Sequence, residues 1–253
     1  MRNGVSLSGK AALITGASRG IGAAAGRALA AAGARVALAA RDEAALAAVV
    51  LDINQAGGQA LAVPTDVADP AAVERMVEQT VAAFGRLDIA FNNAAGGGNR
   101  PMPLADIPID AYDHALLVNL RGVFLGMKYE IPAMLRTGGG AIVNMASTAG
   151  VQGVPGIGAY VASKHGIVGL TRTAALDYAQ RNVRINVVVP GPIFTHHLER
   201  LTEQQREQIA AHVPLRRLGR TEEVAAAVVW LCSDEASFIT GATIPIDGGR
   251  LAG

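Results

Sequence analysis

Short apolar runs, often rich in β-branched residues, alternate with amphipathic stretches along almost the whole sequence. This alternation predicts an α/β fold with a doubly wound, mostly parallel seven-stranded sheet and helices on both faces. The runs are nearly continuous in apolar residues, which indicates strands that are buried on both faces. The strands are expected near residues 11–15, 35–40, 59–64, 88–92, 140–145, 184–189 and 243–246.

Six amphipathic stretches are expected to form helices. They cover residues 21–32, 43–56, 70–84, 110–135, 158–180 and 222–232. Pro132 falls inside the fourth stretch, and because proline lacks a backbone N–H, we expect it to end that helix early.

The chain has 253 residues, of which 51% are hydrophobic and 17% are charged. It is long enough to build a full core and too apolar for a disordered chain. No low-complexity linker, change in composition or repeat of fixed period divides it. We therefore expect residues 1–253 to form a single domain.

The charges nearly balance, with 22 Lys and Arg against 21 Asp and Glu, for a net charge of +1. Such a chain has no broad basic face, which argues against nucleic acid or an anionic membrane as a partner. No apolar stretch approaches the roughly 20 residues that span a bilayer. The first ten residues lack the pattern of a signal peptide, and the single Cys232 cannot form an internal disulfide. We expect a cytoplasmic protein.

A glycine-rich turn, TGASRGIG at residues 15–22, comes directly after the first predicted strand and before a predicted helix. Gly16, Gly20 and Gly22 allow a tight turn and a close approach to a pyrophosphate, which the helix N-terminus would stabilise. The spacing differs from G-x-G-x-x-G, and the ending of a P-loop is missing, which weakens nucleoside-triphosphate hydrolysis as a function. Taken alone, the motif could also be an ordinary turn between a strand and a helix.

Tyr160 and Lys164 are four residues apart in GAYVASKHG, so on a helix they project from one face. Free tyrosine has a pKa of about 10 and is a poor base at pH 7. A neighbouring ammonium would lower the pKa of the phenol, which makes the pair a candidate for proton transfer. Ser147 follows the fifth predicted strand, at the edge where parallel sheets bind ligands, and its hydroxyl could donate to a carbonyl oxygen. Taken singly, these residues would more often be an exposed helical pair and a turn serine.

Several motifs occur together in a characteristic order. They are TGASRGIG, NNAAG at 92–96, Asn119 in LLVNLRG, Ser147, YVASK at 160–164 and PGPIFT at 190–195. With them the chain resembles the short-chain dehydrogenase/reductases from about Gly9 to Gly249. The resemblance implies a Rossmann-type fold and hydride transfer between a nicotinamide cofactor and a carbonyl or secondary alcohol. Ala95 and Ala146 depart from the usual motifs of that family, but neither change removes an expected proton donor.

The resemblance implies a role for each candidate catalytic residue. Tyr160 would be the general acid/base, and Ser147 would orient the carbonyl. Lys164 would bind the nicotinamide ribose and lower the pKa of the tyrosine. Asn119 would help to hold a water that links Lys164 to solvent. The separation of four residues between tyrosine and lysine argues against the enoyl-reductase branch, which uses a wider spacing.

The resemblance also implies the cofactor contacts. Asn92 would brace the sheet and line the cofactor channel, Asp66 would meet the adenine, and the loop after the sixth strand would cover the nicotinamide. The implied cofactor residues are Gly16, Ser18, Arg19, Gly20, Ile21, Gly22, Arg41, Asp66, Val67, Asn92, Ala94, Tyr160, Lys164, Pro190, Gly191, Ile193 and Thr195.

The end of the second predicted strand indicates which nicotinamide cofactor is bound. NAD-binding folds place an acidic residue there for the ribose hydroxyl, whereas this chain has Ala40 followed by Arg41. Arg41 and Arg19 could flank a 2′-phosphate, because guanidinium donors suit phosphate oxygens. NADP(H) is therefore expected over NAD(H), and Asp42 is the feature that argues for NAD(H).

Residues 193–213 form a polar, charged stretch that we expect to be a mobile substrate lid. No metal is expected at its adjacent histidines, because no cysteine or acidic ligand pattern lies near them. A modest organic carbonyl or alcohol is the expected substrate, and the fold does not identify it further. The candidate substrate contacts are Gly97, Gly98, Val154, Ile157, His196 and His197.

The apolar C-terminal segment and the helices at 110–135 and 158–180 resemble the faces through which relatives assemble, so a homotetramer or homodimer is expected. Their apolar content could instead belong to the core. Two other functions stay open: a catalytically silent NADP(H)-binding regulator or scaffold, and an epimerase or dehydratase that uses the same Tyr–Lys pair. The complete catalytic set argues against the first, and the lack of a second substrate domain argues against the second.

Overall fold

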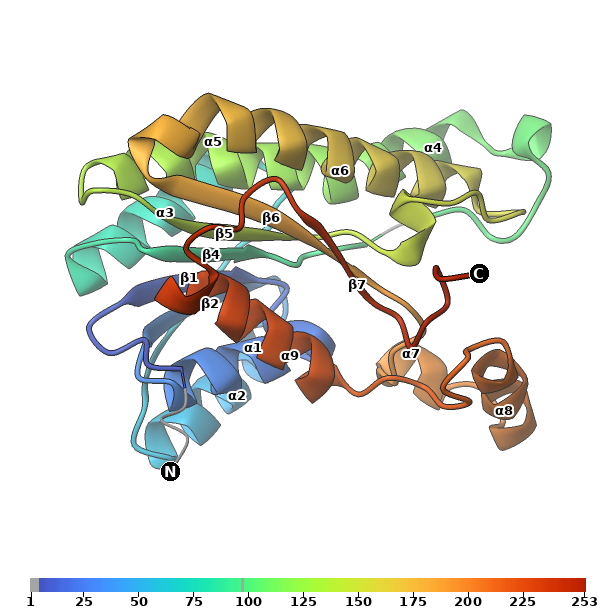
Figure 1. The fold of residues 1–253 in the computed structure, drawn as a ribbon, viewed down its shortest axis with the longest axis horizontal. Coiled ribbons are helices and arrows are strands. Elements are labelled where there is room, and N and C mark those ends of the chain that lie inside the picture. The colour runs from blue at the N-terminus through green and yellow to red at the C-terminus, as the bar shows by residue number, and fades with distance from the viewer. Residues whose placement is uncertain (1–4, 97) are drawn as a thin grey trace.

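The computed structural model describes residues 5–96 and 98–253. Within these residues, a parallel sheet of seven strands runs in the order β3-β2-β1-β4-β5-β6-β7 (Figure 1). The chain builds the sheet outward from β1 in one direction and then from β4 in the other, so the predicted doubly wound fold is confirmed. The strands are β1 (Ala11–Thr15), β2 (Arg35–Ala40), β3 (Gln59–Pro64), β4 (Ile89–Asn92), β5 (Gly140–Met145), β6 (Val183–Pro190) and β7 (Thr243–Ile246).

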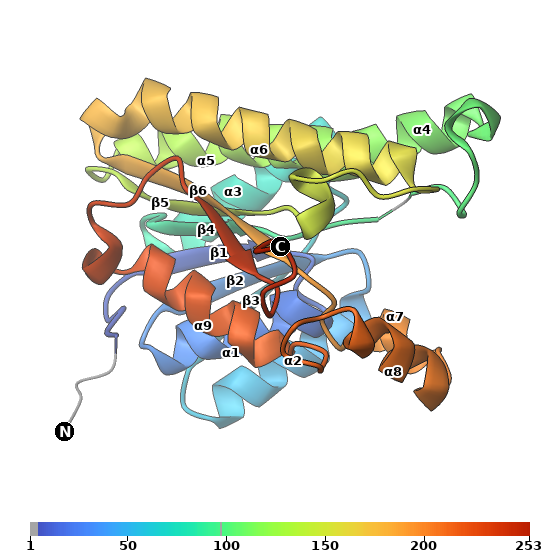
Figure 2. The same ribbon diagram turned by 45° about the vertical axis from the view of Figure 1, so that its right-hand side comes forward.

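Helices cover both faces of the sheet. They are α1 (Gly20–Ala31), α2 (Glu43–Gln55), α3 (Pro70–Phe84), α4 (Ile109–Ala115), α5 (Gly122–Leu135), α6 (Gly158–Tyr178), α7 (His196–Glu199), α8 (Glu203–Ala211) and α9 (Thr221–Cys232). Figures 1 and 2 show α1, α2 and α9 on one face and α3, α5 and α6 on the other. Each layer encloses its own buried core.

Strand β1 shows how one strand serves both cores. Its residues are all buried, and alternate side chains point to opposite faces of a strand. Ala12 and Ile14 pack into the core on the α1, α2 and α9 side, whereas Leu13 packs into the core on the other side. The continuous apolarity of the sequence therefore reflects burial on two faces, as predicted.

Local signals set the helix boundaries. The carboxylate of Asp42 accepts a hydrogen bond from the Ala45 N–H at 3.1 Å and caps α2. Asp69 caps α3 in the same way, and Pro70 occupies the first position of that helix. Helix α3 ends at Gly85, whose φ of 77° suits glycine better than any other residue.

The helix predicted at 110–135 differs from the prediction in two respects. It is divided into α4, a π-helical turn η2 (Leu116–Arg121) and α5. The prediction that Pro132 would end the helix early is wrong, because α5 continues to Leu135 with Pro132 inside it. Proline removes one i→i−4 hydrogen bond close to the end of the helix, and the buried neighbours Ile131, Ala133 and Met134 hold the last turn against the sheet.

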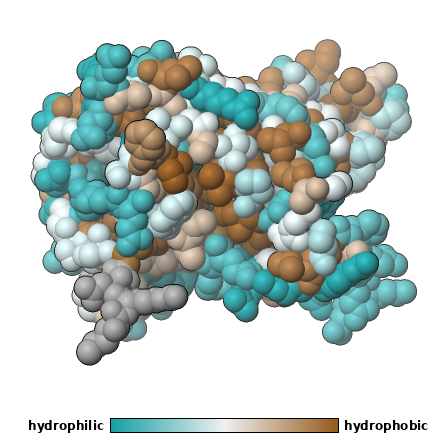
Figure 3. All heavy atoms as spheres, in the orientation of Figure 1, coloured by the Kyte–Doolittle hydropathy of each residue, from teal (hydrophilic) through white to brown (hydrophobic). Residues whose placement is uncertain are grey.

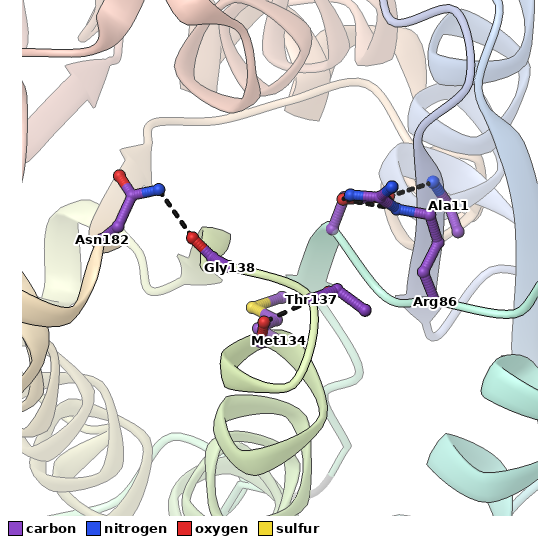
Figure 4. Close-up of polar contacts among 7 residues, drawn as sticks. Ala11, Arg86, Met134, Thr137, Gly138 and Asn182 are labelled. Carbon is purple, nitrogen blue, oxygen red and sulfur yellow. Dashed lines mark hydrogen bonds and ion pairs between the residues drawn. The ribbon is translucent and has the colours of Figure 1, made fainter.

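Polar contacts close the amino edge of the sheet. Asp88 accepts hydrogen bonds from the backbone N–H of Ala11 at 2.8 Å and from the guanidinium of Arg86 at 2.6 Å. At the neighbouring strands, the Asn182 amide donates to the Gly138 carbonyl at 2.8 Å (Figure 4). The first set joins the start of β1 to the segment before β4, and the second joins the segments before β5 and β6.

Candidate active site

A cleft of about 710 Å³ lies along the carboxyl edge of the sheet, lined by segments that follow the strands. This is the edge at which open parallel sheets bind their ligands. The structure brings most of the predicted site residues together there. Those lining the cleft are Gly16, Ser18, Arg19, Gly20, Ile21, Arg41, Asp66, Val67, Ala94, Ser147, Tyr160, Lys164, Pro190, Gly191, Ile193, Thr195 and His196.

The glycine turn fits the pyrophosphate of a dinucleotide. Gly16 and Gly20 adopt φ values of +66° and +56°, which L side chains rarely adopt. Gly22 packs directly against the turn, since a Cβ there would overlap the Gly16 carbonyl oxygen and lie 2.5 Å from the Asn93 Nδ2. The turn leads straight into α1, so an anion in the cleft would meet the N-terminus of that helix.

Ser147 and Tyr160 both line the cleft, and the Ser147 hydroxyl is near enough to the phenol to affect its pKa. Ser147 stands two residues beyond the end of β5 in extended conformation, and its Oγ accepts the Ala149 N–H at 3.2 Å. Tyr160 projects from the first turn of α6. The sheet edge and the helix therefore present two hydroxyl groups to the same space, where both could contact one substrate oxygen.

Lys164 lies one helical turn beyond Tyr160 and is 1% exposed. Its Nζ donates to the Met145 carbonyl at 2.9 Å and lies 5.6 Å from the centroid of the Tyr160 ring. Burial lowers the pKa of Lys164 to about 8. The ammonium is therefore held between the end of β5 and the face of the phenol.

The expected lowering of the tyrosine pKa is not found in this arrangement. Burial raises the pKa of Tyr160, and the nearby Ser147 hydroxyl only partly opposes this increase. Burial favours the neutral phenol because the phenolate would lose its hydration. The Lys164 ammonium lies over the ring and is bonded to a backbone carbonyl, so it does not reverse this effect.

Asn119 lies in the π-helical turn η2 and is fully buried behind the cleft. Its Oδ1 accepts the Gly96 N–H at 2.9 Å, and its Nδ2 donates to the Ser163 Oγ at 3.2 Å. Ser163 in turn donates to the carbonyl of Tyr160 at 2.7 Å. The side chain thus connects the loop after β4 to the first turn of α6.

The two asparagines of the NNAAG motif have different positions. Asn92 was expected to line the cofactor channel, but its side chain is buried and bonded to Glu130 and Asn144 on the α5 side. It braces the sheet, as expected. The cleft is lined instead by Asn93, whose amide donates to the carbonyls of Thr15 and Gly16 at 2.9 and 3.1 Å. Consecutive residues at a strand end point to opposite faces, which accounts for the exchange.

The end of the cleft near the carboxyl end of β2, where the ribose is expected, contains the two predicted arginines and Asp42. Arg19 makes an ion pair with Asp42 at 2.6 Å, and both side chains are about half exposed. Asp42 uses its other carboxylate oxygen to cap α2. Arg41 is exposed and has no ion pair among the described residues.

Comparison with known proteins decides the family. Residues 16–250 match a family model described as enoyl-(acyl carrier protein) reductase. A cyclohexanol dehydrogenase of Acinetobacter sp. is 44% identical, with 94% of each chain aligned. The crystal structure of a short-chain type dehydrogenase/reductase from Mycobacterium marinum superposes with a TM-score of 0.92 at 38% identity, covering 98% of each chain. The chain belongs to the short-chain dehydrogenase/reductase family.

A second relative supports the same chemistry. A 2,5-dichloro-2,5-cyclohexadiene-1,4-diol dehydrogenase of Sphingobium indicum is 44% identical over 97% of this chain and 98% of its own. The protein is accordingly a nicotinamide-dependent oxidoreductase that transfers a hydride between its cofactor and an alcohol or carbonyl group. Among the described residues, no helix is long and apolar enough to cross a membrane.

The candidate substrate residues of this short-chain dehydrogenase/reductase are only partly brought together. A Cβ on Gly98 would lie 3.8 Å from the Cβ of Tyr160, so this loop passes close to Tyr160. Val154 and Ile157 are half-buried and do not line the cleft. Gly97 and the side chain of His197 lie outside the described part of the structure.

The segment expected to be a lid contains α7 and α8, which extend beyond the sheet at one end (Figures 1 and 2). Helix α8 begins with a capping box made by Thr202 and Gln205, and Figure 3 shows a mainly hydrophilic surface in this region. His196 of α7 lines the cleft. The described residues contain no group of histidine, cysteine and acidic side chains arranged to hold a metal ion. Mobility of the segment stays a prediction.

Sequence reasoning missed several residues of the cleft. Asn93 could have been found from strand alternation, because the predicted strand ends at residue 92 as β4 does, but the family resemblance assigned the cleft contact to Asn92. Val118 and Met145 also line the cleft, but in the sequence they look like ordinary core residues. The pairing of Asp42 with Arg19 had no sequence signal, because it depends on how two separate loops meet.

Proposed function

We propose that Tyr160 is the general acid/base of this oxidoreductase, with Ser147 orienting the substrate oxygen and Lys164 holding the nicotinamide ribose. The observation that carries the proposal is that Tyr160 and Ser147 line the same cleft, with the Lys164 ammonium over the tyrosine ring. The glycine turn and the helix N-terminus beside this pair suit a dinucleotide. Asn119 supports the site by fixing the first turn of α6.

The bound nicotinamide supplies or accepts the hydride, and the residues of this chain control the proton. In the reducing direction, the Tyr160 phenol gives its proton to the substrate oxygen. The Ser147 hydroxyl donates a hydrogen bond to the same oxygen as negative charge develops on it. Because burial raises the pKa of Tyr160, the phenol form that reduction needs is present at neutral pH. Oxidation needs the phenolate and is the reverse.

The deciding experiment is Tyr160→Phe, assayed on alcohols and carbonyls by the absorbance of the reduced nicotinamide. Turnover should be lost while NADPH binding, measured by fluorescence titration, changes little. Tyr112→Phe on α4 is the matched control and should keep full activity. Retained turnover in Tyr160→Phe would refute the assignment. If the unchanged protein binds the cofactor but turns over no compound, the result would favour a regulator. If it changes the stereochemistry of a substrate without net oxidation or reduction, the result would favour an epimerase.

We propose NADP(H) as the preferred cofactor and NAD(H) as the alternative. Arg41 supports this, since its guanidinium is exposed at the ribose end of the cleft and free to bind a 2′-phosphate. Arg19 is the second cation, although the ion pair with Asp42 competes for it. The ratio of kcat/KM for NADPH and NADH measures this preference directly.

We propose an alicyclic secondary alcohol, or the corresponding ketone, as the substrate class. Two relatives that are 44% identical over nearly the whole chain are named for cyclohexanol and for a chlorinated cyclohexadiene diol. Val118 and Met145 give the catalytic end of the cleft an apolar wall suited to a ring. A panel of cyclohexanol, a cyclic diol, a linear alcohol and a 3-oxoacyl thioester tests this. Turnover of the thioester alone would refute it.

We also propose that the protein works in the cytoplasm as a homotetramer or homodimer. Exposed apolar side chains on the expected helices support assembly, namely Phe124 on α5 and Leu176 on α6. Figure 3 shows further hydrophobic side chains in the middle of the face that carries β7. Light scattering on the purified protein tests the assembly, and a monomer at all concentrations would refute it.

A further inference from the structure

The carboxyl group of Glu130 lies in the protein interior, where an ionised acid is energetically unfavourable. It lies on α5 and is fully buried. Its Oε2 accepts a hydrogen bond from the Asn92 Nδ2 at 3.0 Å, and its Oε1 has no partner among the described residues. Burial raises the pKa of Glu130 to about 7. A buried polar group without full compensation is unfavourable, so its presence here calls for a reason.

The hydrogen bond from Asn92 is the first of a buried chain. The same Asn92 amide also donates to the Asn144 Oδ1 at 3.1 Å. The Asn144 amide then donates to the Thr171 Oγ1 at 2.9 Å. Four side chains therefore connect α5, β4, β5 and α6, and all of them are almost completely shielded from solvent.

The next residue along each of the two strands belongs to the cleft. Asn93 follows Asn92 and holds the carbonyls of the glycine turn. Met145 follows Asn144, and its carbonyl accepts the hydrogen bond from the Lys164 ammonium. Thr171 lies seven residues beyond Lys164 and so on the same face of α6. The buried chain thus fixes the strand ends and the helix that carry the site.

Gly126 makes room for this arrangement. It lies one turn before Glu130 on α5, on the same helix face. A Cβ on Gly126 would lie 2.5 Å from the Asn92 Oδ1 and 3.2 Å from the Glu130 Oε1. The helix therefore approaches β4 closely at this point, and the carboxyl and the amide fill the slot that glycine leaves.

We propose that Glu130 is a positioning residue for hydride transfer, which acts through Asn92 and Asn144 to fix the ends of β4 and β5 that lead into the cleft. The proposal rests on the proposed function, because it takes Lys164 and the glycine turn as the parts that must be aligned. Small displacements of a catalytic group cost turnover more than binding. We therefore expect that removal of the Glu130 carboxyl changes kcat more than it changes KM.

The test compares three variants of the full-length protein. Glu130→Leu removes both oxygens at similar volume and should lower kcat between about ten-fold and a hundred-fold, with KM and the NADPH Kd within about three-fold. Glu130→Gln keeps an acceptor for the Asn92 amide and should restore kcat to within about three-fold of the unchanged enzyme. Ile131→Val on the same helix is the control for loss of buried packing and should leave kcat unchanged.

Hydrogen exchange gives a readout that does not depend on turnover. In the protein without cofactor, Glu130→Leu should speed exchange at the amides of 93–94 and 145–147, whereas Glu130→Gln and Ile131→Val should not. The hydrogen-exchange measurement still tests the role of Glu130 if the Tyr160→Phe variant refutes the proposed function. If Glu130→Leu does not fold, Thr171→Val breaks the same chain at its other end and should lower kcat in the same way.

Three results would overturn the proposal. The first is an unchanged kcat and unchanged exchange in Glu130→Leu, or in Thr171→Val where the leucine variant does not fold. The second is an equal loss of kcat in Glu130→Leu and Glu130→Gln, which would mean that the hydrogen bond to Asn92 is not the cause. The third is a loss of kcat in Ile131→Val as large as in Glu130→Leu, which would assign the effect to general destabilisation of α5.

Discussion

The ammonium of Lys164 lies 5.6 Å from the centre of the Tyr160 ring while it donates to the Met145 carbonyl at 2.9 Å. The lysine is therefore hydrogen-bonded to the end of β5 and at the same time packed against the Tyr160 phenol. Burial lowers the pKa of Lys164 to about 8 and raises the pKa of Tyr160. Both groups are moved toward their neutral forms, which has a consequence for the direction of catalysis.

Alcohol oxidation should be favoured by alkaline pH. Oxidation needs the Tyr160 phenolate, and a raised pKa means that this form is scarce at neutral pH and increases as the pH rises. Carbonyl reduction needs the phenol, so its kcat/KM should be constant through neutral pH and fall only in the alkaline range. Profiles of kcat/KM in both directions, which report the free enzyme, check this. A rate of oxidation that is already constant below pH 8 would show that the phenol titrates lower than burial dictates.

The preference for NADPH should depend on Arg41 and be limited by Asp42. Arg41→Asp should lower kcat/KM for NADPH between about ten-fold and a hundred-fold, because a charge-assisted bond to phosphate would be replaced by repulsion. Asp42→Asn should raise the NADPH/NADH ratio, since it frees Arg19 while asparagine still caps α2. Arg75→Asp on α3 is the surface control and should change neither value. An unchanged ratio in Arg41→Asp would remove the case for NADP(H).

The Gly22→Ala variant should lose cofactor affinity. A Cβ at this position overlaps the Gly16 carbonyl oxygen and the Asn93 amide, so the backbone of the turn must move. Overpacking of this kind costs about 1–3 kcal/mol, and a cost of that size in the bound state corresponds to roughly five-fold to a hundred-fold in the NADPH Kd. Gly169→Ala on α6 is the control, because a Cβ there meets nothing within 4 Å. Fluorescence titration measures both, and equal affinities would mean that the turn tolerates a side chain.

Much of this site could be predicted because it depends on local patterns. The glycine turn is contiguous in sequence and follows a recognisable strand, and Tyr160 and Lys164 share a helix face through their spacing alone. The effect of burial on the Tyr160 pKa could not be read in the same way. It depends on how completely α6, β5 and the loops around Ser147 exclude water, and only the packed structure determines that.

The misplaced residues have equally specific causes. The end of β4 was predicted correctly at residue 92, but the resemblance gave Asn92 both the bracing role and the cleft contact, whereas adjacent side chains at a strand end point to opposite faces and the cleft contact belongs to Asn93. Pro132 was judged by its local helix propensity, but burial of its neighbours overrides that propensity.

Glu130 did leave a sequence signal, since it lies one turn from Gly126 and one turn from Met134 on an apolar helix face.

Ionisation of Glu130 should lower the free energy of unfolding as the pH rises from about 4.5 to 7. Its pKa is about 7 in the folded protein against an ordinary value of 4.5, so the folded state binds the proton more tightly than the unfolded chain. The favourable contribution is complete below pH 4.5 and is lost as the pH rises through 7, a total of roughly 3 kcal/mol. Burial is the main cause, and the hydrogen bond from Asn92 opposes it.

The Glu130→Gln variant isolates this contribution, because all other titrating groups stay the same in both proteins. Urea unfolding should be measured at pH 5, 6, 7 and 8. The free energy of unfolding of the glutamine variant, minus that of the unchanged protein, should increase as the pH rises. The difference should stop growing near pH 8, since the carboxyl is then largely ionised in both the folded and the unfolded state. A difference that is independent of pH would mean that Glu130 keeps an ordinary pKa, for example through water that reaches its Oε1 in solution.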